Sequence, residues 1–386
     1  MKKILIVHTR YQNLGGEDIA VENEVDFLAK HFTVDTLYFS NEIESILKLL
    51  KIFIFNSNDS AVRSLKEKID VFNPDLVYVH NTWFKGSNGI LKFLIDKNIK
   101  FVLKIHNFRY FCTKNLLFKK HIGTQKFCSA CGIYSEKRYL FNKYFQDSIL
   151  KSILVLRYGL KYFKIIKNGN FKIFVLTQFH KNFLEKLGIN KERIIVFKNH
   201  ISIKTSSNNI QSKKNIVYAG RVSKEKGVPE LINAFNSLFL DKYELNIIGD
   251  GPLIEELREI HASKNVIFHG QLSNKATMKK IQDSLCVVTT TKLYEGQPTL
   301  LCEASSLGIP SIYPNTEGIA EFFPGSSQLS FKQYDYADLQ RKLKLIIDEE
   351  LMKSEGEKNR VFISETLNEK KLLENFNKVF KKEQDG

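Results

Sequence analysis

The sequence predicts an α/β protein built from two doubly wound parallel sheets, each covered by helices. Short apolar runs rich in β-branched residues alternate with helical patterns through most of the chain. Glycine-bearing loops follow several of these runs, where parallel strands would end. The 386 residues, 43% of them hydrophobic, are enough for two or three domains with cores of their own.

The first half of the chain contains one such alternation. Strands are expected at residues 4–8, 33–39, 75–80, 101–105, 171–176 and 194–197. Helical patterns lie at 19–29, at 59–72 and after Thr177, which is expected to cap its helix. The polar, turn-rich segment 199–213 then predicts a linker. We therefore place the first domain at residues 1–200, with a basic, aromatic insertion at about 107–170.

A second alternation follows in the second half. Strands are expected at 216–218, 245–249, 266–270 and 285–290, within a sheet that runs from Asn215 to about Phe331. Helices are expected at 335–350, 353–363 and 368–382. We place the second domain at 201–365 and a separate C-terminal helix at 366–386. The apolar stripe of that helix consists of Leu372, Leu373, Phe376, Val379 and Phe380.

The stretch from Glu295 to Glu303 is the first candidate site. It follows the strand 285–290, and Pro298 suits the first turn of a helix. The free backbone N–H groups at a helix start favour an anion, so a site with two carboxylates suits a ligand that has phosphates and hydroxyls. A sugar nucleotide is such a ligand. The alternative is an ordinary surface turn with two solvated acids.

Three further strand-end motifs precede this stretch. Arg221 and Lys226 lie in one loop after the strand 216–218, where two fixed cations can hold a diphosphate. The strand 245–249 runs into a glycine-rich turn with the residues Gly249-Asp250-Gly251-Pro252-Leu253. The strand 266–270 ends in Phe268-His269-Gly270.

These motifs, in this order and at these spacings, resemble the donor half of the family 4 retaining glycosyltransferases, of the bacterial surface-polysaccharide type. The resemblance covers roughly residues 213 to 312. It implies the GT-B fold, in which two Rossmann-like domains face a central cleft and the terminal helix crosses back onto the first domain. It also implies a nucleotide-diphosphate sugar as donor.

The resemblance implies a role for each motif residue. Arg221 and Lys226 would neutralise the diphosphate, so that no divalent metal or other cofactor is required. Glu303 would bind the ribose hydroxyls, and Glu295 would act as a catalytic residue that contacts the transferred sugar. The remaining donor-binding residues would be Gly15, Gly16, Asp250, Gly251, Gly270, Gln271, Gly296, Gln297, Pro298 and Thr299.

In the first half, the loop after the first strand contains Gly15-Gly16, which lets backbone approach a ligand closely. His80 and His106 each follow a strand end. By resemblance, His106 lies beside the transferred sugar and is the second catalytic candidate, while His80 has the same placement. A tight turn without ligand contact and two structural histidines are the alternatives. No pair of residues is an obvious nucleophile and acid/base couple, which fits the front-face route proposed for the resembled family.

A cysteine cluster lies in the insertion. Cys128 and Cys131 have zinc-knuckle spacing, and Cys112 and His121 could complete four ligands. A structural zinc is therefore one possibility and three plain thiols are the other.

The charge of the chain is concentrated in one segment. Residues 1–205 hold 34 basic and 17 acidic residues, and residues 97–172 alone hold 17 and 2. Between residues 139 and 167 the basic residues alternate with aromatic and aliphatic ones, a pattern typical of contact with an anionic membrane surface. The alternative is a pair of core helices with a solvated cationic face. No nucleic-acid motif accompanies the basic segment, so we expect no nucleic-acid partner.

The start of the chain lacks the pattern of a signal peptide, and no stretch has the roughly 18 apolar residues that a spanning helix needs. We therefore expect a cytoplasmic protein, peripheral on the inner face of the cell membrane. The predicted function is sugar transfer from a nucleotide sugar to a saccharide acceptor, which we expect to be lipid-linked, in surface polysaccharide or glycan synthesis. Other possibilities are a GT-B epimerase or phosphorylase, a sugar-nucleotide-binding scaffold without catalysis, and a basic nucleic-acid-binding protein.

Overall fold

The computed structural model describes residues 1–11, 15–41, 52–108, 128–129, 148–201, 214–238, 240–261 and 265–381. The chain divides into two compact units. Unit 1 consists of Met1–His200 together with Glu369–Gly386, and unit 2 consists of Ile201–Asn368. Among the described helices, none combines the length and the apolar character needed to cross a membrane.

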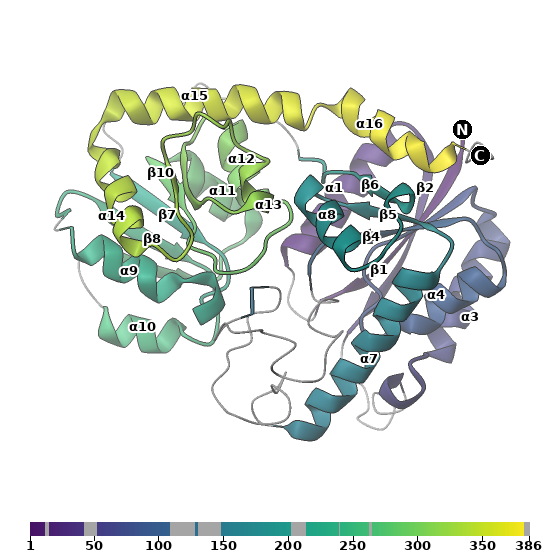
Figure 1. Ribbon diagram of the computed structural model, residues 1–386. Coiled ribbons are helices and arrows are strands. Elements are labelled where there is room, and N and C mark those ends of the chain that lie inside the picture. The colour runs from purple at the N-terminus through teal and green to yellow at the C-terminus, as the bar shows by residue number, and fades with distance from the viewer. Residues whose placement is uncertain are drawn as a thin grey trace. The chain divides into compact units, whose positions relative to one another are not determined.

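Unit 1 is a six-stranded parallel sheet with helices packed around it (Figure 1). Its strands are β1 (Lys3–Arg10), β2 (Thr33–Ser40), β3 (Leu76–Val79), β4 (Phe101–Ile105), β5 (Lys172–Val175) and β6 (Ile194–Val196). Its helices are α1 (Gly16–Ala29), α3 (Asp59–Phe72), α4 (Ser87–Asp96), α7 (Ile149–Asn168), α8 (Gln178–Lys186) and α16 (Glu369–Asn377), with the 3₁₀ turns η1 (Lys191–Arg193) and η4 (Lys378–Phe380).

The strand order in unit 1 is β2-β1-β3-β4-β5-β6. The central strands are buried along their whole length, as in Leu76–Val79 and Phe101–Ile105. Continuous apolar runs of this kind are expected where helices cover both faces of a parallel sheet. The direction in which successive strands are added to the sheet reverses between β1 and β3, because β2 lies on one side of that pair and β4 to β6 lie on the other.

Helix α16 belongs to unit 1 although it lies at the far end of the sequence. Its buried residues Leu372 and Phe376 join the core that β1, β3, β5 and α1 form. The Phe376 ring lies 5.6 Å from the ring of Tyr78, 5.7 Å from that of Phe174 and 5.5 Å from that of Phe197. The apolar stripe of α16 is thus part of the core of unit 1.

Unit 2 is a second parallel sheet of six strands. Its strands are β7 (Asn215–Ala219), β8 (Glu244–Ile248), β9 (Val266–Gly270), β10 (Cys286–Val288), β11 (Ser311–Pro314) and β12 (Ser330–Phe331). Its helices are α9 (Val228–Asn236), α10 (Ile254–Ile260), α11 (Asn274–Gln282), α12 (Thr299–Ser306), α13 (Glu317–Ala320), α14 (Tyr336–Lys344) and α15 (Glu349–Thr366), with the 3₁₀ turns η2 (Lys224–Lys226) and η3 (Leu345–Ile347).

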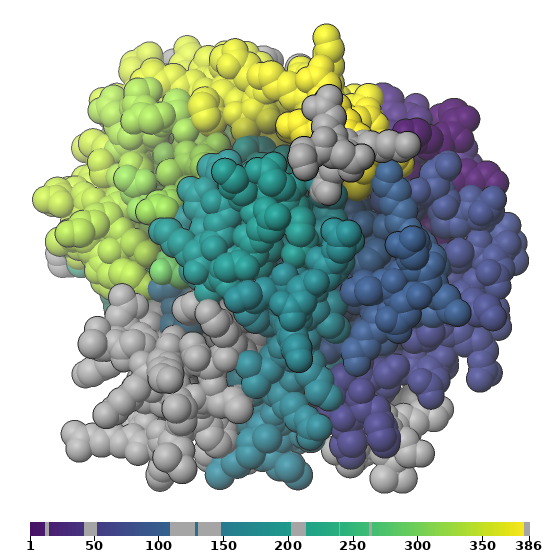
Figure 2. All heavy atoms as spheres, turned by 45° about the vertical axis from the view of Figure 1, so that its right-hand side comes forward, coloured from purple at the N-terminus to yellow at the C-terminus, as the bar shows by residue number. Residues whose placement is uncertain are grey.

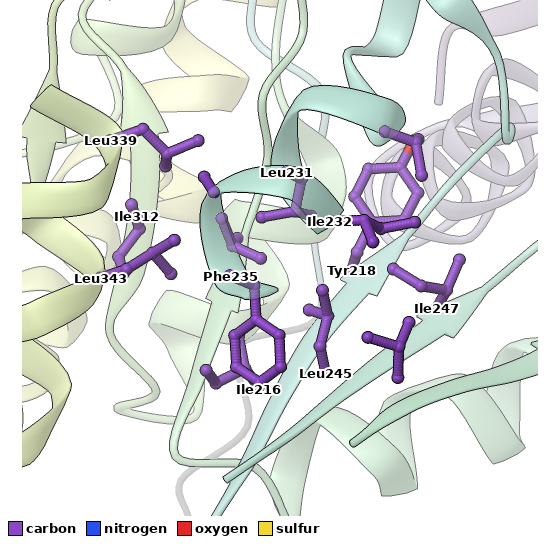
Figure 3. Close-up of a cluster of buried hydrophobic side chains, with 14 of the residues drawn as sticks. Ile216, Tyr218, Leu231, Ile232, Phe235, Leu245, Ile247, Ile312, Leu339 and Leu343 are labelled. Carbon is purple, nitrogen blue, oxygen red and sulfur yellow. The ribbon is translucent and has the colours of Figure 1, made fainter. Parts of the chain in front are cut away.

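The strand order in unit 2 is β12-β11-β10-β7-β8-β9. A core on one face joins strands β7 and β8 to helices α9 and α14, as Figure 3 shows for Tyr218, Leu231, Leu245 and Leu339. A second core includes Val217, Ile248 and Val287 with residues of α12 and α15. The predicted class, an α/β protein with two doubly wound Rossmann-like domains, is confirmed.

The helices near the C-terminus differ from the prediction in their boundaries. The helix expected at 335–350 ends at Lys344 and is followed by the 3₁₀ turn η3. Helix α15 then begins at Glu349 rather than at residue 353. The reason is Asp348, whose carboxylate accepts a hydrogen bond from the backbone N–H of Leu351 and so caps α15. The helix expected at 368–382 ends earlier, because the 3₁₀ turn η4 follows Asn377.

Candidate functional site

The candidate donor site lies where strands β7 and β10 of unit 2 lie side by side. Strands β8 and β9 continue the sheet on one side of this pair, and β11 and β12 continue it on the other. The loops after β7 and β10 therefore lead away in opposite directions. They form a topological switch point between them, the place where open α/β sheets bind ligands. Lys226 and Glu295, 69 residues apart in the sequence, lie in these two loops.

The loop after β7 is held in a defined shape. Lys226 ends the 3₁₀ turn η2, and Gly227 follows with a φ of +70°, which favours glycine. The hydroxyl of Thr290, after β10, donates to the carbonyl oxygens of Lys226 (3.1 Å) and Gly227 (2.8 Å). A Cβ atom on Gly227 would lie 2.3 Å from the carbonyl oxygen of Thr290. The backbone beneath the ammonium group of Lys226 is thus fixed by the neighbouring loop.

Lys226 and Glu295 form an ion pair across the switch point, between Lys226 Nζ and Glu295 Oε1. The same carboxylate oxygen accepts a hydrogen bond from the Thr291 hydroxyl at 2.9 Å. Both members of the pair remain partly exposed, the lysine at 29% and the glutamate at 25%. A fixed cation and a fixed carboxylate that are both open to solvent can bind a ligand with a phosphate beside hydroxyl groups.

A second ion pair supports the loop after β10. Lys292 Nζ lies 2.6 Å from Glu230 Oε1, and the backbone N–H of Lys292 donates to the carbonyl oxygen of Glu225 at 2.9 Å. The sequence analysis did not single out Lys292 or Glu230. The available signal was the opposite charge of these two residues, one after each strand. They connect the two loops from the side of α9.

Arg221 is exposed at the end of β7. Its carbonyl oxygen accepts a hydrogen bond from the Tyr218 hydroxyl at 2.9 Å. Burial, together with the charges of Glu295 and Glu225, raises the pKa of Tyr218 well above its ordinary value. Tyr218 therefore remains a donor at neutral pH and helps to fix the backbone that carries the guanidinium group.

The glycine turn after β8 packs against this backbone. The N–H of Gly220 donates to Ile248 O, and the N–H of Val222 donates to Asp250 O, both at 2.9 Å. Gly249 has a φ of +125°, and a Cβ on it would lie 2.0 Å from the carbonyl oxygen of Gly220. A Cβ on Gly251 would lie 2.3 Å from Val222 O. Because these two glycines have no side chain, the backbones of the two turns can pack closely together.

The strand end at Gly270 adjoins the same turn. The N–H of Gly249 donates to Gly270 O at 2.8 Å, and the side chains of Asp250 and Gln271 are exposed. The ends of the adjacent strands β8 and β9 therefore carry four of the predicted residues, Asp250, Gly251, Gly270 and Gln271. The structure brings these predicted residues together with Arg221.

Helix α12 begins directly after the loop of Glu295. Pro298 is its N-cap residue rather than a residue of its first turn, so that part of the prediction is wrong by one position. Its φ of −78° suits the ring, while its ψ of 78° lies outside the helical region. Gly296 and Gln297 are buried, and Thr299 is the first helical residue. Glu303 is half-buried about one turn further along the helix.

In unit 1, the loop after β1 leads into α1. Gly15 is the N-cap residue, and its N–H donates to Asp18 Oδ2 at 2.8 Å, while Gly16 is exposed. Asp18 Oδ1 lies 2.8 Å from His8 Nε2. The hydrogen bonds from His8 and Gly15 outweigh burial and lower the pKa of the Asp18 carboxyl. The role of Gly15 visible here is to begin the helix.

His80 and His106 lie at the ends of β3 and β4 and are in direct contact. His80 Nδ1 and His106 Nε2 are 2.9 Å apart. His80 is buried and His106 is half-buried. The sequence argument missed the buried groups behind them: Glu24 forms an ion pair with Lys104, and Tyr78 donates to Glu24 Oε2 at 2.6 Å. Lys104 within the apolar run Phe101–Ile105 was the visible signal.

Of the four predicted zinc ligands, only Cys128 lies among the described residues, where it is buried. Cys112, His121 and Cys131 lie outside them. In the part of the chain that the structure describes, no three histidine, cysteine or carboxylate side chains are grouped to hold a metal ion. The zinc site therefore stays a prediction.

Residues 200–369 match the family model described as "Glycosyl transferases group 1". The amylovoran biosynthesis glycosyltransferase AmsD of Erwinia amylovora is 23% identical over 325 residues, 81% of this chain and 80% of AmsD. The capsular polysaccharide biosynthesis glycosyltransferase CapM of Staphylococcus aureus is 26% identical over 182 residues, 44% of this chain and 47% of CapM. The chain spans about half or less of the length of most curated relatives it matches.

Two solved structures illustrate the similarity of fold. Sucrose-phosphate synthase from Thermosynechococcus elongatus has a TM-score of 0.72 at 13% identity, with 98% of each chain covered. Anabaena HepE, solved in complex with UDP-glucose, has a TM-score of 0.65 at 14% identity, with 98% of this chain and 99% of HepE covered. At such identities the likeness shows the fold alone.

The family match and the relatives named as glycosyltransferases support a glycosyltransferase. Some of these relatives are named for capsule or other polysaccharide synthesis. The chain has the GT-B fold, and its residues 200–369, which include all of unit 2, are similar to the glycosyl transferases of group 1.

Proposed function

We propose that this protein is a retaining glycosyltransferase that transfers a sugar from a nucleoside-diphosphate sugar to a saccharide acceptor. The observation that carries the proposal is the pairing of Lys226 with Glu295 at the switch point of unit 2, with a helix start directly after it. These are the groups that a sugar diphosphate needs: a cation for phosphate and a carboxylate for sugar hydroxyls.

Each donor group has a proposed partner. Arg221 and Lys226 bind the diphosphate, and the backbone N–H groups on either side of Pro298, which has none of its own, support the phosphate or the sugar. Glu303 binds the ribose hydroxyls. Two cations near the leaving group compensate its charge, so a divalent metal is not required.

The base is proposed to lie along the ends of β8 and β9. Asp250, Gly251, Gly270 and Gln271 are the residues at these ends, and the exposed side chains of Asp250 and Gln271 are open to a ligand. The close backbone packing at Gly249 and Gly251 gives this edge a fixed shape.

Glu295 is proposed to bind a hydroxyl of the transferred sugar rather than to attack the anomeric carbon. One of its oxygens already accepts from Lys226 and Thr291, which stabilises the carboxylate and lowers its nucleophilicity. With no separate nucleophile assigned, the leaving phosphate accepts the proton of the acceptor hydroxyl on the same face. In unit 1, Gly15, Gly16 and His106 are proposed to contact the donor, with His106 beside the transferred sugar.

Thermal stabilisation by nucleoside diphosphates and their sugars, in buffer without divalent metal, tests the donor site. We expect one diphosphate to raise the melting temperature, its sugar to raise it further, and Glu303→Ala to lose both effects. UDP and UDP-glucose are the first ligands to use, because HepE was solved with both. The absence of a shift with every diphosphate would contradict the proposal.

The acceptor is proposed to be a growing surface polysaccharide on a lipid carrier, since AmsD and CapM are named for amylovoran and capsular polysaccharide synthesis. A lipid-linked acceptor fits a peripheral membrane protein. The first turns of α7 expose Ile149, Leu150 and Ile153, and the basic side chains Arg157 and Lys164 are exposed further along the helix. The start of α7 lies at the surface in Figure 2.

We restrict the proposed membrane surface to the start of α7, because three of the aromatic side chains further along the helix are buried. The aromatic side chains Tyr158, Tyr162 and Phe163 are buried in unit 1 and cannot insert into a bilayer. For these three aromatic side chains, the alternative interpretation, that they belong to a core helix, is the better one. Each exposed basic residue near an anionic surface contributes about 1 kcal/mol, so a few of them would hold the protein reversibly.

Sedimentation with vesicles tests this surface. We expect binding to vesicles that contain anionic lipid, and a loss of binding when Ile149, Leu150 and Ile153 are all replaced by asparagine. The matched control is Ile260→Asn, a similarly exposed isoleucine in unit 2. Equal binding by the triple variant and the control would remove the membrane surface from the proposal, and binding to RNA but not to vesicles would favour the nucleic-acid alternative.

A further inference from the structure

A chain of buried polar groups lies at the switch point of the sheet in unit 1. Glu24 on α1 pairs with Lys104 on β4 through its Oε1 atom and accepts from the Tyr78 hydroxyl of β3 through Oε2. All three side chains are fully buried. Burial, and then the charge of Glu24, raise the pKa of Tyr78 well above its ordinary value, so this hydroxyl remains a donor. The Glu24 carboxylate is thus a fixed negative group below the strand ends.

Two histidines continue this chain towards the end of the sheet. The rings of His80 and His106 have centroids 5.2 Å apart and planes within 20° of each other, and the facing nitrogens are 2.9 Å apart. The rings therefore meet edge to edge, close to one plane. Burial lowers the pKa of both imidazoles well below the usual range, and Lys104 and His8 add to the effect. Both rings are neutral at pH 7, so one of the two facing nitrogens donates and the other accepts.

The surroundings of His80 decide the direction of that hydrogen bond. His80 Nε2 is buried without a hydrogen-bond partner among the described residues, and the Oε2 atom of Glu24 lies 3.8 Å from it. A lone pair on Nε2 would face the carboxylate and be repelled by it, whereas an N–H there is attracted. The proton of His80 therefore belongs on Nε2. Its Nδ1 is then the acceptor, and His106 Nε2 must be the donor.

We propose that His80 is a positioning residue that holds His106 in the tautomer protonated on Nε2, so that His106 Nδ1 presents a lone pair to a ligand hydroxyl. The sequence of contacts runs from Glu24 through His80 to His106 and orients both rings. The ligand in this statement rests on the proposed function, in which the hydroxyl belongs to the transferred sugar or the acceptor. The tautomer itself follows from unit 1 alone.

The imidazole ¹H–¹⁵N correlation spectrum of the full-length protein, labelled with ¹⁵N in histidine, tests the tautomer directly. The signals of His106 are identified by their loss in His106→Asn. We expect Nε2 of His106 to show the shift of a protonated nitrogen and Nδ1 that of an unprotonated one. In His80→Leu, we expect His106 to become a mixture of both tautomers. His80→Asn, whose amide oxygen can accept in place of Nδ1, should restore the single form.

His31→Asn is the matched control, because His31 lies on the same unit, against the edge of the Phe27 ring, outside this chain of contacts. It should leave the His106 signals unchanged. The wild-type spectrum remains a test if a His80 variant does not fold. A wild-type His106 protonated on Nδ1, or a folded His80→Leu protein with an unchanged His106, would overturn the proposal.

Kinetics separate this inference from the proposed function. We expect His80→Leu to lower kcat roughly 10- to 100-fold while the affinity for the nucleoside diphosphate stays the same, and His80→Asn to recover most of the loss. If His106 is protonated on Nε2 but the protein binds no nucleoside diphosphate, the inferred tautomer is correct and the proposed function is wrong. Donor turnover that is insensitive to His80→Leu would reject the positioning role and leave the function standing.

Discussion

At the scale of single residues, the candidate donor site depends on two kinds of close contact. One is backbone against backbone at the glycines after β7 and β8, where a side chain has no room. The other is the ion pair of Lys226 and Glu295, which joins two loops. The first shapes the site and the second supplies its chemistry, so substitutions should affect stability and ligand binding separately.

Gly249→Ala tests the shaping role. The new methyl group would lie 2.0 Å from the carbonyl oxygen of Gly220, at a φ of +125° that an alanine rarely adopts. We expect a loss of about 2 to 3 kcal/mol in the free energy of unfolding, measured by urea denaturation. Gly325→Ala is the control, because nothing lies within 4 Å of its added Cβ. Equal stability of the two variants would contradict the packing argument.

Lys226→Ala tests the chemical role. Removing a charged donor from a phosphate should weaken nucleoside-diphosphate binding by about 1.5 to 3 kcal/mol, roughly 10- to 100-fold, measured by titration calorimetry. Lys224→Ala is the matched control, since Lys224 is an exposed lysine in the same 3₁₀ turn. Should both variants bind equally well, Lys226 does not contact the diphosphate.

At the scale of elements, the most informative helix is α16. Its sequence is distant from every strand of unit 1, yet Phe376 lies among Tyr78, Phe174 and Phe197. His200, the last residue of the first segment of unit 1, lies 3.0 Å from Glu369 at the start of this helix, and Lys30 lies 2.8 Å from the same carboxylate. The helix therefore contributes core and polar contacts to unit 1, and its loss would open the face of the sheet.

Phe376→Ala measures that contribution. Removing a fully buried ring from a core costs about 3 to 5 kcal/mol, so we expect a loss of that size in the stability of unit 1. Phe55→Ala is the matched control, because the same change is made at a side chain that is 68% exposed. A loss below 1 kcal/mol in Phe376→Ala would mean that α16 is only loosely held on unit 1.

At the scale of the whole molecule, buried histidines make stability depend on pH. Burial lowers the pKa of His180 to about 3, and the pKa values of His80 and His106 are also lowered. The unfolded chain protonates these side chains below pH ~6.5, whereas the folded chain does not. The unfolded state thus binds more protons there, and stability is present above this pH and lost as the pH falls.

The expected size follows from the same linkage. Between pH 7.5 and 5.5, each such histidine should lower the free energy of unfolding by about 1.4 kcal/mol. His180→Gln should therefore reduce the difference between the two pH values by that amount, measured by urea denaturation at each pH, whatever its effect on stability at pH 7.5. An unchanged difference would show that His180 titrates normally in the folded protein.

Much of the molecule could be predicted from the sequence because its signals are local. The alternation of apolar runs and helical patterns predicted strands β1 to β6 of unit 1, strands β7 to β10 of unit 2 and the doubly wound class, but it did not predict β11 and β12. The strand-end loops marked the residues from Arg221 to Glu303. The cap of α8 at Thr177 was also local, and its hydroxyl accepts from the His180 N–H. The start of α15 at Glu349 was missed because a helical pattern continues through the capping residue Asp348.

Tertiary structure alone decided which of these residues meet. The order of strands in a sheet depends on contacts between distant segments, so nothing local places β10 beside β7 or Glu295 against Lys226. The same holds for Glu24 and Lys104, 80 residues apart, and for His80 and His106. The sequence by itself determined which side chains stand at strand ends, because that follows from periodicity. The pairing of those side chains, and hence the chemistry of each switch point, was decided only by the fold that brings the ends together.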